Sequence, residues 1–496
     1  MLLRDIIVSR KHLSKTAIRC GSADISYGEL HRYALRCGAA INQYTHAGRN
    51  IGIFLPNSIQ YVIAYFAITF AGKTIVPIHS QSKETELESV IKYCELGLII
   101  SNSHYMERLK TYLEGMKCTV SILNIDTVDF ESIGEAAVGE DTLLHRQESC
   151  IEDENATALL LHTSGTTSNP KRVMLSHKNL IENAKSIIES LELTEEDKTL
   201  ISLPLCMASA NTSQLLTHLY LGASIVIMNS VFLPSLFFKL VDVEKITNFT
   251  GVPSLMYTIV DFKNRNNYDI SSLQLICFGG AKTPVEKIRK LLEGFPEIEF
   301  AHMYGQTEAS TRITHLLPQD AFTRIGSVGK PIPGVQVRIV DEEGRDVSVG
   351  TEGEVIVKGD NVMSGYYNRP EETAKVLRQG WLHTGDLGFH DAEGYIYIVG
   401  RKRNVIISGG MNIYPEELEE ILMTHEYVRE VCVMGEENEE FGQVPVAKVV
   451  TEAGAGWIGQ DELINFCAKK IAAYKVPHRI YFVKELPKTV TGKVKR

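Results

Sequence analysis

The chain has 496 residues, of which 44% are hydrophobic and 23% charged, close to the averages of globular proteins. This composition excludes a disordered, collagenous or coiled-coil chain, and the length indicates about three domains or subdomains. The formal net charge of -10 argues against dedicated binding of nucleic acid or of anionic lipid, because an acidic surface repels phosphate groups. The nine cysteines are scattered and lack metal-ligand spacing, which indicates a reduced, cytoplasmic protein.

No segment predicts a membrane span or a signal peptide. The most apolar stretch, residues 59–70, is shorter than the roughly 20 residues that a spanning helix needs. It is followed by Gly72, a residue typical of helix ends, so we expect a buried core helix. The first ten residues carry Arg4, Asp5 and Arg10 and contain no long apolar run.

Helices and strands alternate up to about residue 320. Ser26 and Glu29 form a capping box that predicts a helix running toward Asn42. Apolar periodicity predicts further helices over residues 59–71, 84–94, 179–191 and 232–244. It predicts strands over residues 51–55, 74–77, 98–101, 158–162, 224–228, 273–278 and 300–303. This alternation is typical of layered α/β proteins with largely parallel sheets.

The pattern changes at Gly326. Strands predicted over residues 335–340, 354–358 and 395–399 indicate a small β-rich subdomain at about 326–400. A charged break, Arg401-Lys402-Arg403-Asn404, follows it. Beyond the break we expect a compact α/β unit with helices over 415–423 and 461–473 and strands over 428–434 and 444–451. We therefore predict an N-terminal domain of residues 1–402 and a C-terminal lid domain of residues 403–496.

A loop rich in hydroxyl groups follows the strand predicted over residues 158–162. Hydroxyl groups, free backbone N–H groups and a lysine together suit phosphate oxygens. The loop is not a Walker A motif, because it lacks the second glycine and Arg172 follows its lysine. Phosphate binding and a solvated loop both remain open for this segment, which consists of Thr163, Ser164, Gly165, Thr166, Thr167, Ser168, Asn169, Pro170 and Lys171.

Four further segments carry candidate chemistry. They are Tyr304-Gly305-Gln306-Thr307-Glu308, residues 381–386 ending in Asp386, Gly400-Arg401, and residues 487–493 ending in Lys493. An aromatic ring can stack on a flat base, and a Thr–Glu pair suits Mg²⁺. An acidic residue near an arginine can hold a ribose. Taken singly, the simpler interpretations are a helix start, a turn with a surface charge, and a solvated terminal lysine.

Together, and in this order, these segments resemble the motifs of the adenylate-forming superfamily. That superfamily includes acyl- and aryl-CoA synthetases, adenylation domains of peptide synthetases and firefly-type luciferases. The resemblance covers nearly the whole chain and includes Leu203-Pro204-Leu205, Gly251-Val252-Pro253-Ser254, Gly279-Gly280-Ala281 and residues 326–331 and 408–417. It implies a large N-terminal domain hinged to a small mobile C-terminal domain. It also implies two half-reactions: a carboxylate and Mg·ATP give acyl-AMP and pyrophosphate, and a thiol then displaces AMP.

The resemblance also implies roles for individual residues. Lys493 bridges the carboxylate and the α-phosphate, Thr307 contacts the α-phosphate, and Glu308 binds Mg²⁺ with Thr167, so that Lys493, Glu308 and Thr307 form the catalytic set. Asp386 and Arg401 hold the ribose. The remaining ATP-binding residues are Thr163, Ser164, Gly165, Thr166, Thr167 and Lys171 at the phosphates and Gly279, Gly280, Ala281, Tyr304, Gly305 and Gln306 at the adenine. Arg403 is the hinge, and the thiol arm approaches along Ser408, Gly409 and Gly410.

The acid pocket is expected to contain Met207, Ala208, Asn211, Val252, Gly279 and Met303. None of these residues is acidic, so a buried α-ammonium would lack a counter-charge, and α-amino acids should be poor substrates. We expect an apolar acid, fatty or aromatic, that is uncharged beyond its reacting carboxylate. Arg312 could pair with a second carboxylate or phenolate, but a surface salt bridge is the simpler interpretation.

Several positions depart from the superfamily pattern. Ser168 and Arg172 stand where glycines are usual, and Arg403 stands where Asp or Lys is usual. Cys206-Met207 replaces an aromatic–His pair, which puts the usual gate over the acid site in doubt. No lysine occurs in the strand predicted over residues 405–408, so light emission is not expected.

Three functions remain open. The favoured one is an acyl- or aryl-CoA synthetase that uses ATP, Mg²⁺ and coenzyme A on a small carboxylic acid. The second is a stand-alone ligase that loads the acid onto the phosphopantetheine of an acyl carrier protein. The third is a catalytically silent nucleotide- or acyl-binding regulator, which the presence of Glu308, Asp386, Arg401 and Lys493 argues against.

Overall fold

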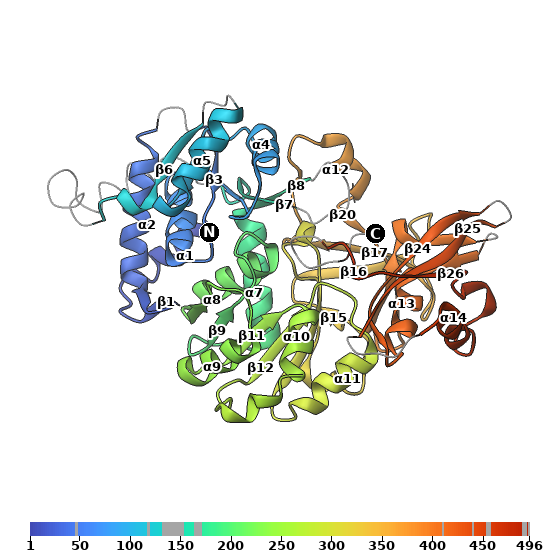
Figure 1. The fold of residues 1–496 in the computed structure, drawn as a ribbon. Coiled ribbons are helices and arrows are strands. Elements are labelled where there is room, and N and C mark those ends of the chain that lie inside the picture. The colour runs from blue at the N-terminus through green and yellow to red at the C-terminus, as the bar shows by residue number, and fades with distance from the viewer. Residues whose placement is uncertain are drawn as a thin grey trace.

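The computed structural model describes residues 1–44, 48–116, 120–130, 153–162, 171–408, 411–438, 441–452, 458–488 and 494. Figure 1 shows a large N-terminal part built of helices and sheets, and a smaller C-terminal part at its side. The protein is therefore a mixed α/β protein with a large N-terminal and a small C-terminal domain, as the sequence predicts.

One sheet of the large part has seven strands in the order β18-β8-β7-β4-β3-β5-β6. The strands from β7 to β6 run parallel, and β8 and β18 are antiparallel to their neighbours. The predicted strands are present, with small shifts at their ends. The bounds are β3 (Asn50–Ile53), β4 (Thr74–Pro77), β5 (Leu98–Ser101), β6 (Ser121–Asn124), β7 (Thr157–His162), β8 (Arg172–Ser176) and β18 (Gly365–Tyr366).

A second sheet has nine strands in the order β15-β14-β13-β12-β11-β9-β10-β1-β2. Its central strands, from β1 to β13, are parallel, so their carboxyl ends meet at one edge. The bounds are β1 (Thr16–Cys20), β2 (Ala23–Ser26), β9 (Lys198–Ile201), β10 (Ser224–Ile227), β11 (Asn248–Gly251), β12 (Leu275–Gly279), β13 (Glu299–Tyr304), β14 (Thr314–Leu316) and β15 (Lys330–Pro331).

The helices of the large part pack on these sheets (Figure 1). Ser26 begins α2 as predicted: its Oγ accepts a hydrogen bond from Glu29 N, and Glu29 Oε2 accepts one from Ser26 N. Almost all of α3 is buried, which explains its apolar sequence. The bounds are α1 (Leu3–Val8), α2 (Tyr27–Ile41), α3 (Ile59–Phe70), α4 (Glu84–Tyr93), α5 (Ser103–Met116), α7 (His177–Leu191), α8 (Leu216–Leu221), α9 (Pro234–Glu244), α10 (Pro253–Val260), α11 (Val285–Gly294) and α12 (Pro370–Val376).

A five-stranded antiparallel sheet forms the β-rich part predicted after residue 326. Its order is β16-β17-β20-β19, with β21 paired to β20. The charged break is a short 3-10 helix, Lys402–Asn404, that follows β21 directly. The bounds are β16 (Val335–Val340), β17 (Gly353–Gly359), β19 (Leu377–Arg378), β20 (Trp381–His390) and β21 (Ile396–Arg401).

The C-terminal part has its own five-stranded sheet and apolar core. The second helix ends earlier than predicted: the N–H groups of Lys470 and Ile471 both bond to Cys467 O, and Ile471 then packs on the core. The bounds are β22 (Ile406–Ser408), β23 (Met411–Ile413), β24 (Val428–Asn438), β25 (Gly442–Thr451), β26 (Arg479–Phe482), α13 (Pro415–Met423) and α14 (Gln460–Ala468).

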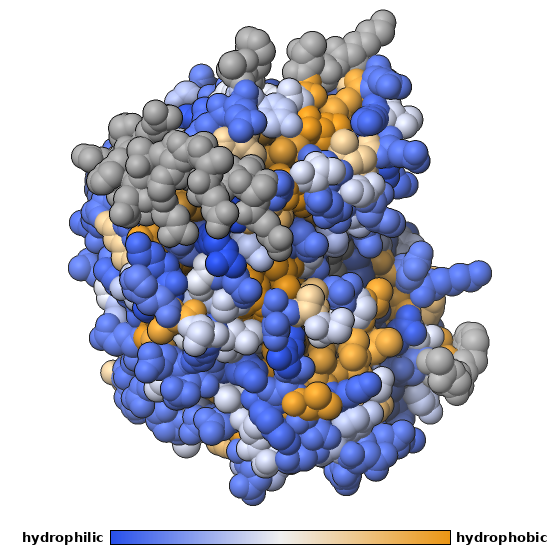
Figure 2. Space-filling view, turned by 90° about the vertical axis from the view of Figure 1, so that its left-hand side faces the viewer, coloured by the Kyte–Doolittle hydropathy of each residue, from blue (hydrophilic) through white to orange (hydrophobic). Residues whose placement is uncertain are grey.

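The surface is largely polar on the face shown in Figure 2, where hydrophilic side chains surround smaller apolar patches. Within the described ranges, no helix has both the length and the apolarity required to cross a membrane.

Candidate active site

The carboxylate of Asp386 brings three of the predicted motifs together. Tyr304 donates its hydroxyl hydrogen to Oδ2 over 2.7 Å, and Gln306 donates from Nε2 to the same oxygen over 2.5 Å. Arg401 Nε lies 2.7 Å from Oδ1, and only 4% of the Asp386 side chain is exposed. Burial and the neighbouring Asp386 carboxylate raise the pKa of Tyr304 well above its usual range, so its hydroxyl remains a donor.

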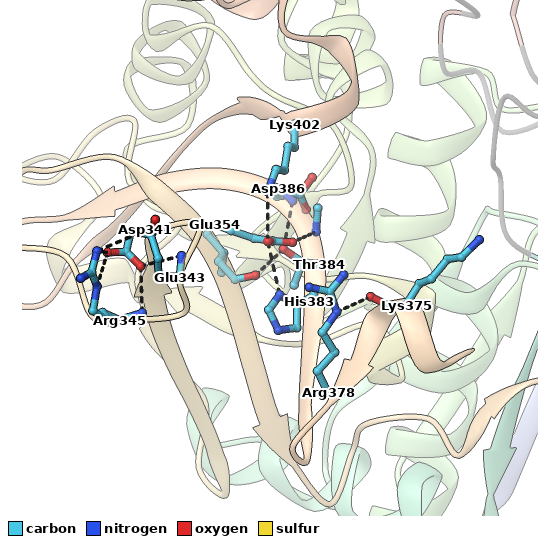
Figure 3. Close-up of polar contacts among 12 residues, drawn as sticks. Asp341, Glu343, Arg345, Glu354, Lys375, Arg378, His383, Thr384, Asp386 and Lys402 are labelled. Carbon is cyan, nitrogen blue, oxygen red and sulfur yellow. Dashed lines mark hydrogen bonds and ion pairs between the residues drawn. The ribbon is translucent and has the colours of Figure 1, made fainter. Parts of the chain in front are cut away.

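Strand geometry places Asp386 in this position. Asp386 on β20 lies directly opposite Arg401 on the antiparallel neighbour β21. The backbone N–H of Asp386 donates to Thr384 Oγ1, whose hydroxyl donates in turn to Val355 O. Figure 3 shows Thr384 and Asp386 beside Glu354 on β17. The interpretation of this segment as a turn with a surface charge is therefore wrong, because pairing on both sides buries the carboxylate in a strand.

Glu308 lies just past the end of β13, in the 3-10 helix Thr307–Ala309. The hydroxyl of Tyr366 donates to Glu308 Oε1 over 2.8 Å, and the backbone N–H of Met363 donates to Glu308 O over 2.9 Å. One side chain and one backbone group from the segment around β18 thus fix this residue. The motif analysis singled out neither Tyr366 nor Met363, because they lie more than fifty positions downstream.

The connection between β13 and β14 has an unusual backbone. Thr311 has φ +88°, which is strained for a β-branched residue. Its Oγ1 lies 2.9 Å from Thr212 Oγ1 and also contacts Ser213 Oγ. Asn361 donates from Nδ2 to Ala309 O and to Arg312 O, over 3.1 and 2.7 Å. These neighbours hold the segment that carries Thr307 and Glu308 in a defined shape. Thr212 and Ser213 lie in the stretch expected to border the acid pocket, whereas Asn361 was not predicted.

Glycines allow the ends of β12 and β13 to come close. A Cβ on Gly279 would lie 2.2 Å from Met303 O, its partner across the strand pair. Gly280 has φ +87°, and the nearest atom to a Cβ placed there is Val252 Cγ1, at 4.0 Å. The structure thus brings three predicted pocket residues, Gly279, Met303 and Val252, together with Gly280. Ala281 is exposed at the end of this turn.

The segment before the remaining pocket residues is fixed by buried hydrogen bonds. Asn57 donates to Leu203 O and accepts from Leu205 N, while Tyr61 donates its hydroxyl to Leu205 O. A π-helix, Ser209–Leu215, follows, a form that occurs often at functional sites. Within it, Asn211 is fully buried, accepts from Tyr65 OH over 2.9 Å and donates to Leu205 O over 3.0 Å.

The remaining predicted residues of this segment are accessible. Met207 and Ala208 are both half-buried at the start of the π-helix. Asn211, by contrast, uses both ends of its amide to hold its neighbours. In the structure Asn211 therefore supports the pocket segment, while Met207 and Ala208 retain surface for a ligand.

Lys171 is the one residue of the predicted phosphate loop, residues 163–171, that the structure describes. Lys171 Nζ lies 2.6 Å from Glu372 Oε2 and 4.6 Å from the centre of the Tyr366 ring. The hydroxyl of Tyr366 also donates to Glu308, so the same side chain contacts both Lys171 and the predicted magnesium ligand. Outside the described residues lie Thr163, Ser164, Gly165, Thr166 and Thr167.

Among the predicted residues of the C-terminal part, Arg403 lies in the 3-10 helix after β21 and is exposed. Ser408 is buried at the end of β22 and pairs with Gly442 on β25. Glu420 on α13 contacts the large part through Lys282 Nζ, at 3.2 Å. Three predicted residues lie outside the described ranges: Gly409, Gly410 and Lys493.

Arg312 differs from its expected environment. Arg312 is only 6% exposed. In the part of the chain that the structure describes, no carboxylate pairs with it. The interpretation as a surface salt bridge is therefore wrong, because the β13–β14 connection turns this residue into the interior.

The residues present fit a magnesium ion. Mg²⁺ is commonly held by one or two carboxylates, together with substrate phosphates and water. Glu308 offers a half-buried carboxylate of which Tyr366 uses one oxygen. Among the described residues, no group of three or more His, Cys, Asp and Glu side chains is placed to hold a metal alone.

Comparison with known proteins identifies the family. The AMP-binding enzyme family matches residues 7–367, and the AMP-binding enzyme C-terminal domain matches residues 417–493. An indoleacetate–CoA ligase of Aromatoleum aromaticum is 31% identical over 489 residues, which cover 97% of this chain and 94% of the relative. A feruloyl-CoA synthase of an Amycolatopsis species is 32% identical over 480 residues, with the same coverage.

Solved structures agree. The o-succinylbenzoate CoA synthetase of Bacillus subtilis, in complex with an acyl-adenylate intermediate, aligns with a TM-score of 0.87 at 28% identity, over 99% of this chain and 96% of that chain. Its complex with ATP and a magnesium ion aligns with a TM-score of 0.87 at 27% identity, over 99% and 98%. The chain therefore belongs to the AMP-binding enzyme family and is an AMP-forming acid–thiol ligase.

Proposed function

We propose that this ligase activates a carboxylic acid with an apolar body, fatty or aromatic, as its acyl-adenylate and then transfers the acyl group to coenzyme A. The observation that carries the proposal is the convergence of Tyr304, Gln306 and Arg401 on the buried carboxylate of Asp386. Relatives named for indoleacetate, ferulate and long-chain fatty acids support this acid class.

The nucleotide lies, in this proposal, along the edge where β12, β13 and β21 end, beside Asp386 in the middle of β20. Asp386 and Arg401 bind the ribose, and the Tyr304 ring lies against the adenine beside the Gly279–Gly280 turn. Lys171 faces the phosphates and exchanges its ion pair with Glu372 for one with a phosphate oxygen. Such an exchange costs little, because both partners are about a third exposed.

The first half-reaction forms a bond between the acid carboxylate and the α-phosphorus, and the bond to pyrophosphate breaks. Negative charge spreads over phosphoryl oxygens, so the protein needs positioned cations and hydrogen-bond donors. We assign these roles to Thr307, Lys171 and Lys493. Mg²⁺, when bound at Glu308, neutralises phosphate charge.

The acid occupies the space bounded by Met207, Ala208, Val252, Gly279 and Met303. None of these residues carries a counter-charge for an α-ammonium, and burying an unpaired ammonium costs several kcal/mol. α-Amino acids are therefore expected to be poor substrates. A methionine adapts its shape readily, so a ring or an alkyl chain fits beside Met207.

In the second half-reaction the thiol sulfur attacks the acyl carbonyl and AMP leaves. We assign the approach of the thiol arm to Ser408, Gly409 and Gly410, after the C-terminal domain rotates about Arg403. Coenzyme A is the proposed acceptor, because the named relatives are CoA ligases. Transfer to an acyl carrier protein is the competing outcome.

The test measures both half-reactions separately. Purified enzyme, ATP and Mg²⁺ are incubated with a panel of fatty, aromatic and α-amino acids, and pyrophosphate release is recorded. Active acids are then offered coenzyme A or a phosphopantetheinylated carrier protein, with the products identified by mass spectrometry. We expect acid-dependent pyrophosphate release and a CoA thioester. Thioester formed only on the carrier protein, or a preference for an amino acid over its desamino analogue, would contradict the proposal.

A further inference from the structure

Arg312 is a buried arginine that has no counter-charge among the residues that the structure describes. Its guanidinium can donate five hydrogen bonds, yet the one recorded for it joins Nη1 to the neighbouring Thr311 O at 3.5 Å, the outer limit for such a bond. Nε is buried and has no hydrogen-bond partner in the described part of the chain. Leaving a buried guanidinium in this state is costly, and groups of this kind cluster at functional sites.

Within the described ranges of the chain, no carboxylate acts on Arg312. Burial lowers the pKa of Arg312 to about 10, so the side chain is still charged near neutral pH. Burial raises the pKa of the nearby Cys277 thiol to about 11 and lowers the pKa of His315 to about 3. Both neighbours are therefore neutral, and the guanidinium carries the local charge alone.

The neighbours of Arg312 place it beside the proposed acid pocket. It interacts electrostatically with Cys277 on β12 and with His315, which lies opposite Met303 across the β13–β14 pair. Cys277 and Met303 belong to one apolar cluster on this face of the sheet. Met303 pairs with Gly279 of the proposed acid pocket, so the groups that interact with Arg312 neighbour two pocket residues.

A second nitrogen on this face is also unpartnered. His315 Nδ1 lies 2.8 Å from Ser190 Oγ, but its Nε2 is buried without a hydrogen-bond partner. The backbone here is well fixed: Asn361 bonds Arg312 O, and Thr311 bonds the π-helix. The fold thus holds a charged guanidinium and a neutral imidazole with unused nitrogens next to two residues of the proposed pocket, Gly279 and Met303.

We propose that Arg312 is a specificity-determining residue that binds a second carboxylate, at the far end of the acid, so that the substrates are dicarboxylic acids activated at one end. The planar guanidinium matches a carboxylate with two parallel hydrogen bonds, and His315 supplies a further donor. The proposal rests on the ligase function and acid site proposed above. It replaces the expectation of an acid with no second charge, which assumed that Arg312 was at the surface.

The test uses substrate sets matched in length and shape. Each set contains a dicarboxylic acid, its half methyl ester and the methyl-terminated monoacid, in aliphatic and aromatic series of increasing length. We expect the wild type to prefer the best diacid over its half ester by about 100-fold in kcat/KM, since a hydrogen-bonded charge pair contributes on that scale. Pyrophosphate release is the readout for all three acids.

Two variants separate recognition from folding. Arg312→Met removes the charge from a buried site, and we expect it to abolish the diacid preference, chiefly through KM for the acid, while KM for ATP stays unchanged. Arg312→Lys should retain part of the preference. Arg108→Met is the matched control and should keep the preference: it removes a guanidinium that donates to the carbonyls of Ser80 and Ser82 and lies over aromatic rings. Thermal melting establishes that each variant is folded.

The outcomes are distinct. An active wild type that treats diacid and half ester alike, or an Arg312→Met enzyme that keeps the preference, overturns the inference and leaves the ligase function intact. Preference for the half ester or for the methyl-terminated monoacid in the wild type also overturns it. If Arg312→Met does not fold, the preference of the wild type between diacid and half ester decides by itself whether the inference holds. Absence of pyrophosphate release with every acid would contradict the ligase function itself.

Discussion

At the scale of single residues, the hydrogen-bond acceptor sites of the Asp386 carboxylate are nearly all occupied. A carboxylate has about four acceptor sites, and Tyr304, Gln306 and Arg401 use three of them. A ribose that binds through both hydroxyls therefore requires one neutral donor, Tyr304 or Gln306, to release its bond. The ion pair with Arg401 can remain, which makes Asp386 and Arg401 the stable part of the proposed ribose site.

Glu308→Gln tests the proposed magnesium ligand. The amide keeps the size of the side chain and still accepts from Tyr366, but it loses the charge that a hard cation prefers. We expect a folded protein whose ATP–pyrophosphate exchange falls about 100-fold or more, with the largest loss at low Mg²⁺. Glu286→Gln, an exposed carboxylate on α11, is the control. Exchange within a few-fold of wild type across the Mg²⁺ titration would rule out this role.

The buried His302 is expected to make the stability of the protein depend on pH. Its ring stacks on Phe278, its Nδ1 lies 2.8 Å from Ser327 O, and burial lowers its pKa to about 4. In the unfolded chain the pKa is about 6.5. Below about pH 6.5 the unfolded state binds a proton that the folded state does not, so stability falls by up to about 1.4 kcal/mol per pH unit until about pH 4.

His302→Gln tests this linkage, because the amide N–H can still reach the carbonyl of Ser327. We expect the variant to be less stable at neutral pH, yet to lose less stability than wild type on acidification. Melting temperatures recorded from about pH 7 down to pH 5 give both slopes. Parallel slopes for the two proteins would show that His302 does not take part.

At the scale of elements, the connection between β13 and β14 carries much of the proposed chemistry. Glu308 and Arg312 lie four positions apart in it, and its backbone includes the strained Thr311. Strain of this kind costs about 1–3 kcal/mol and persists only where the surroundings fix the chain. Here the fixing groups are Thr212, Ser213 and Asn361, which come from two other elements.

Gly279→Ala tests the close approach of β12 and β13. The new methyl group would lie 2.2 Å from Met303 O, so the strands must separate at the pocket. We expect a loss of about 3 kcal/mol in stability, at the upper end for overpacking. Gly280→Ala is the control: space is open there, and only the positive φ costs about 1–2 kcal/mol. Equal losses in urea unfolding would contradict the steric role of Gly279.

At the scale of the whole molecule, the C-terminal part has its own core and contacts the large part through polar side chains. Glu420 pairs with Lys282, and its Oε1 accepts a hydrogen bond from the backbone N–H of Val285 over 3.4 Å. Polar interfaces between domains commonly permit rotation. This arrangement supports our proposal that one domain serves two half-reactions in turn, with residues 403–496 moving about Arg403.

Lys493→Ala tests this two-state proposal. If Lys493 reaches the α-phosphate only in the adenylating arrangement, its loss should reduce acyl-AMP formation by about 100-fold or more and spare thioester formation from supplied acyl-AMP. Lys488→Ala, which removes a lysine paired with Glu430, is the control. Rapid-quench measurement of each half-reaction gives the two rates. An equal loss in both, in a folded protein, would rule out separate arrangements.

Much of the architecture could be predicted from the sequence because its signals are local. Ser26 and Glu29 set the start of α2 through hydrogen bonds only three positions apart. The apolar periodicity of α3 and the strands β4 and β5 predicted those elements almost to the residue. The equally short strands β9 (Lys-Thr-Leu-Ile) and β11 (Asn-Phe-Thr-Gly) were not predicted, because polar residues make up half or more of each.

The sequence by itself determined the order of the motifs, and with it the family, the α/β fold and the chemistry of acid activation. Only the tertiary structure decided which groups meet. Tyr304 and Asp386 are 82 positions apart, and Tyr366 and Glu308 are 58 apart, so no local pattern links them. The burial of Arg312 depends on Thr311, Asn361 and the packing of two sheet strands, because a side chain's environment is set by elements distant in sequence.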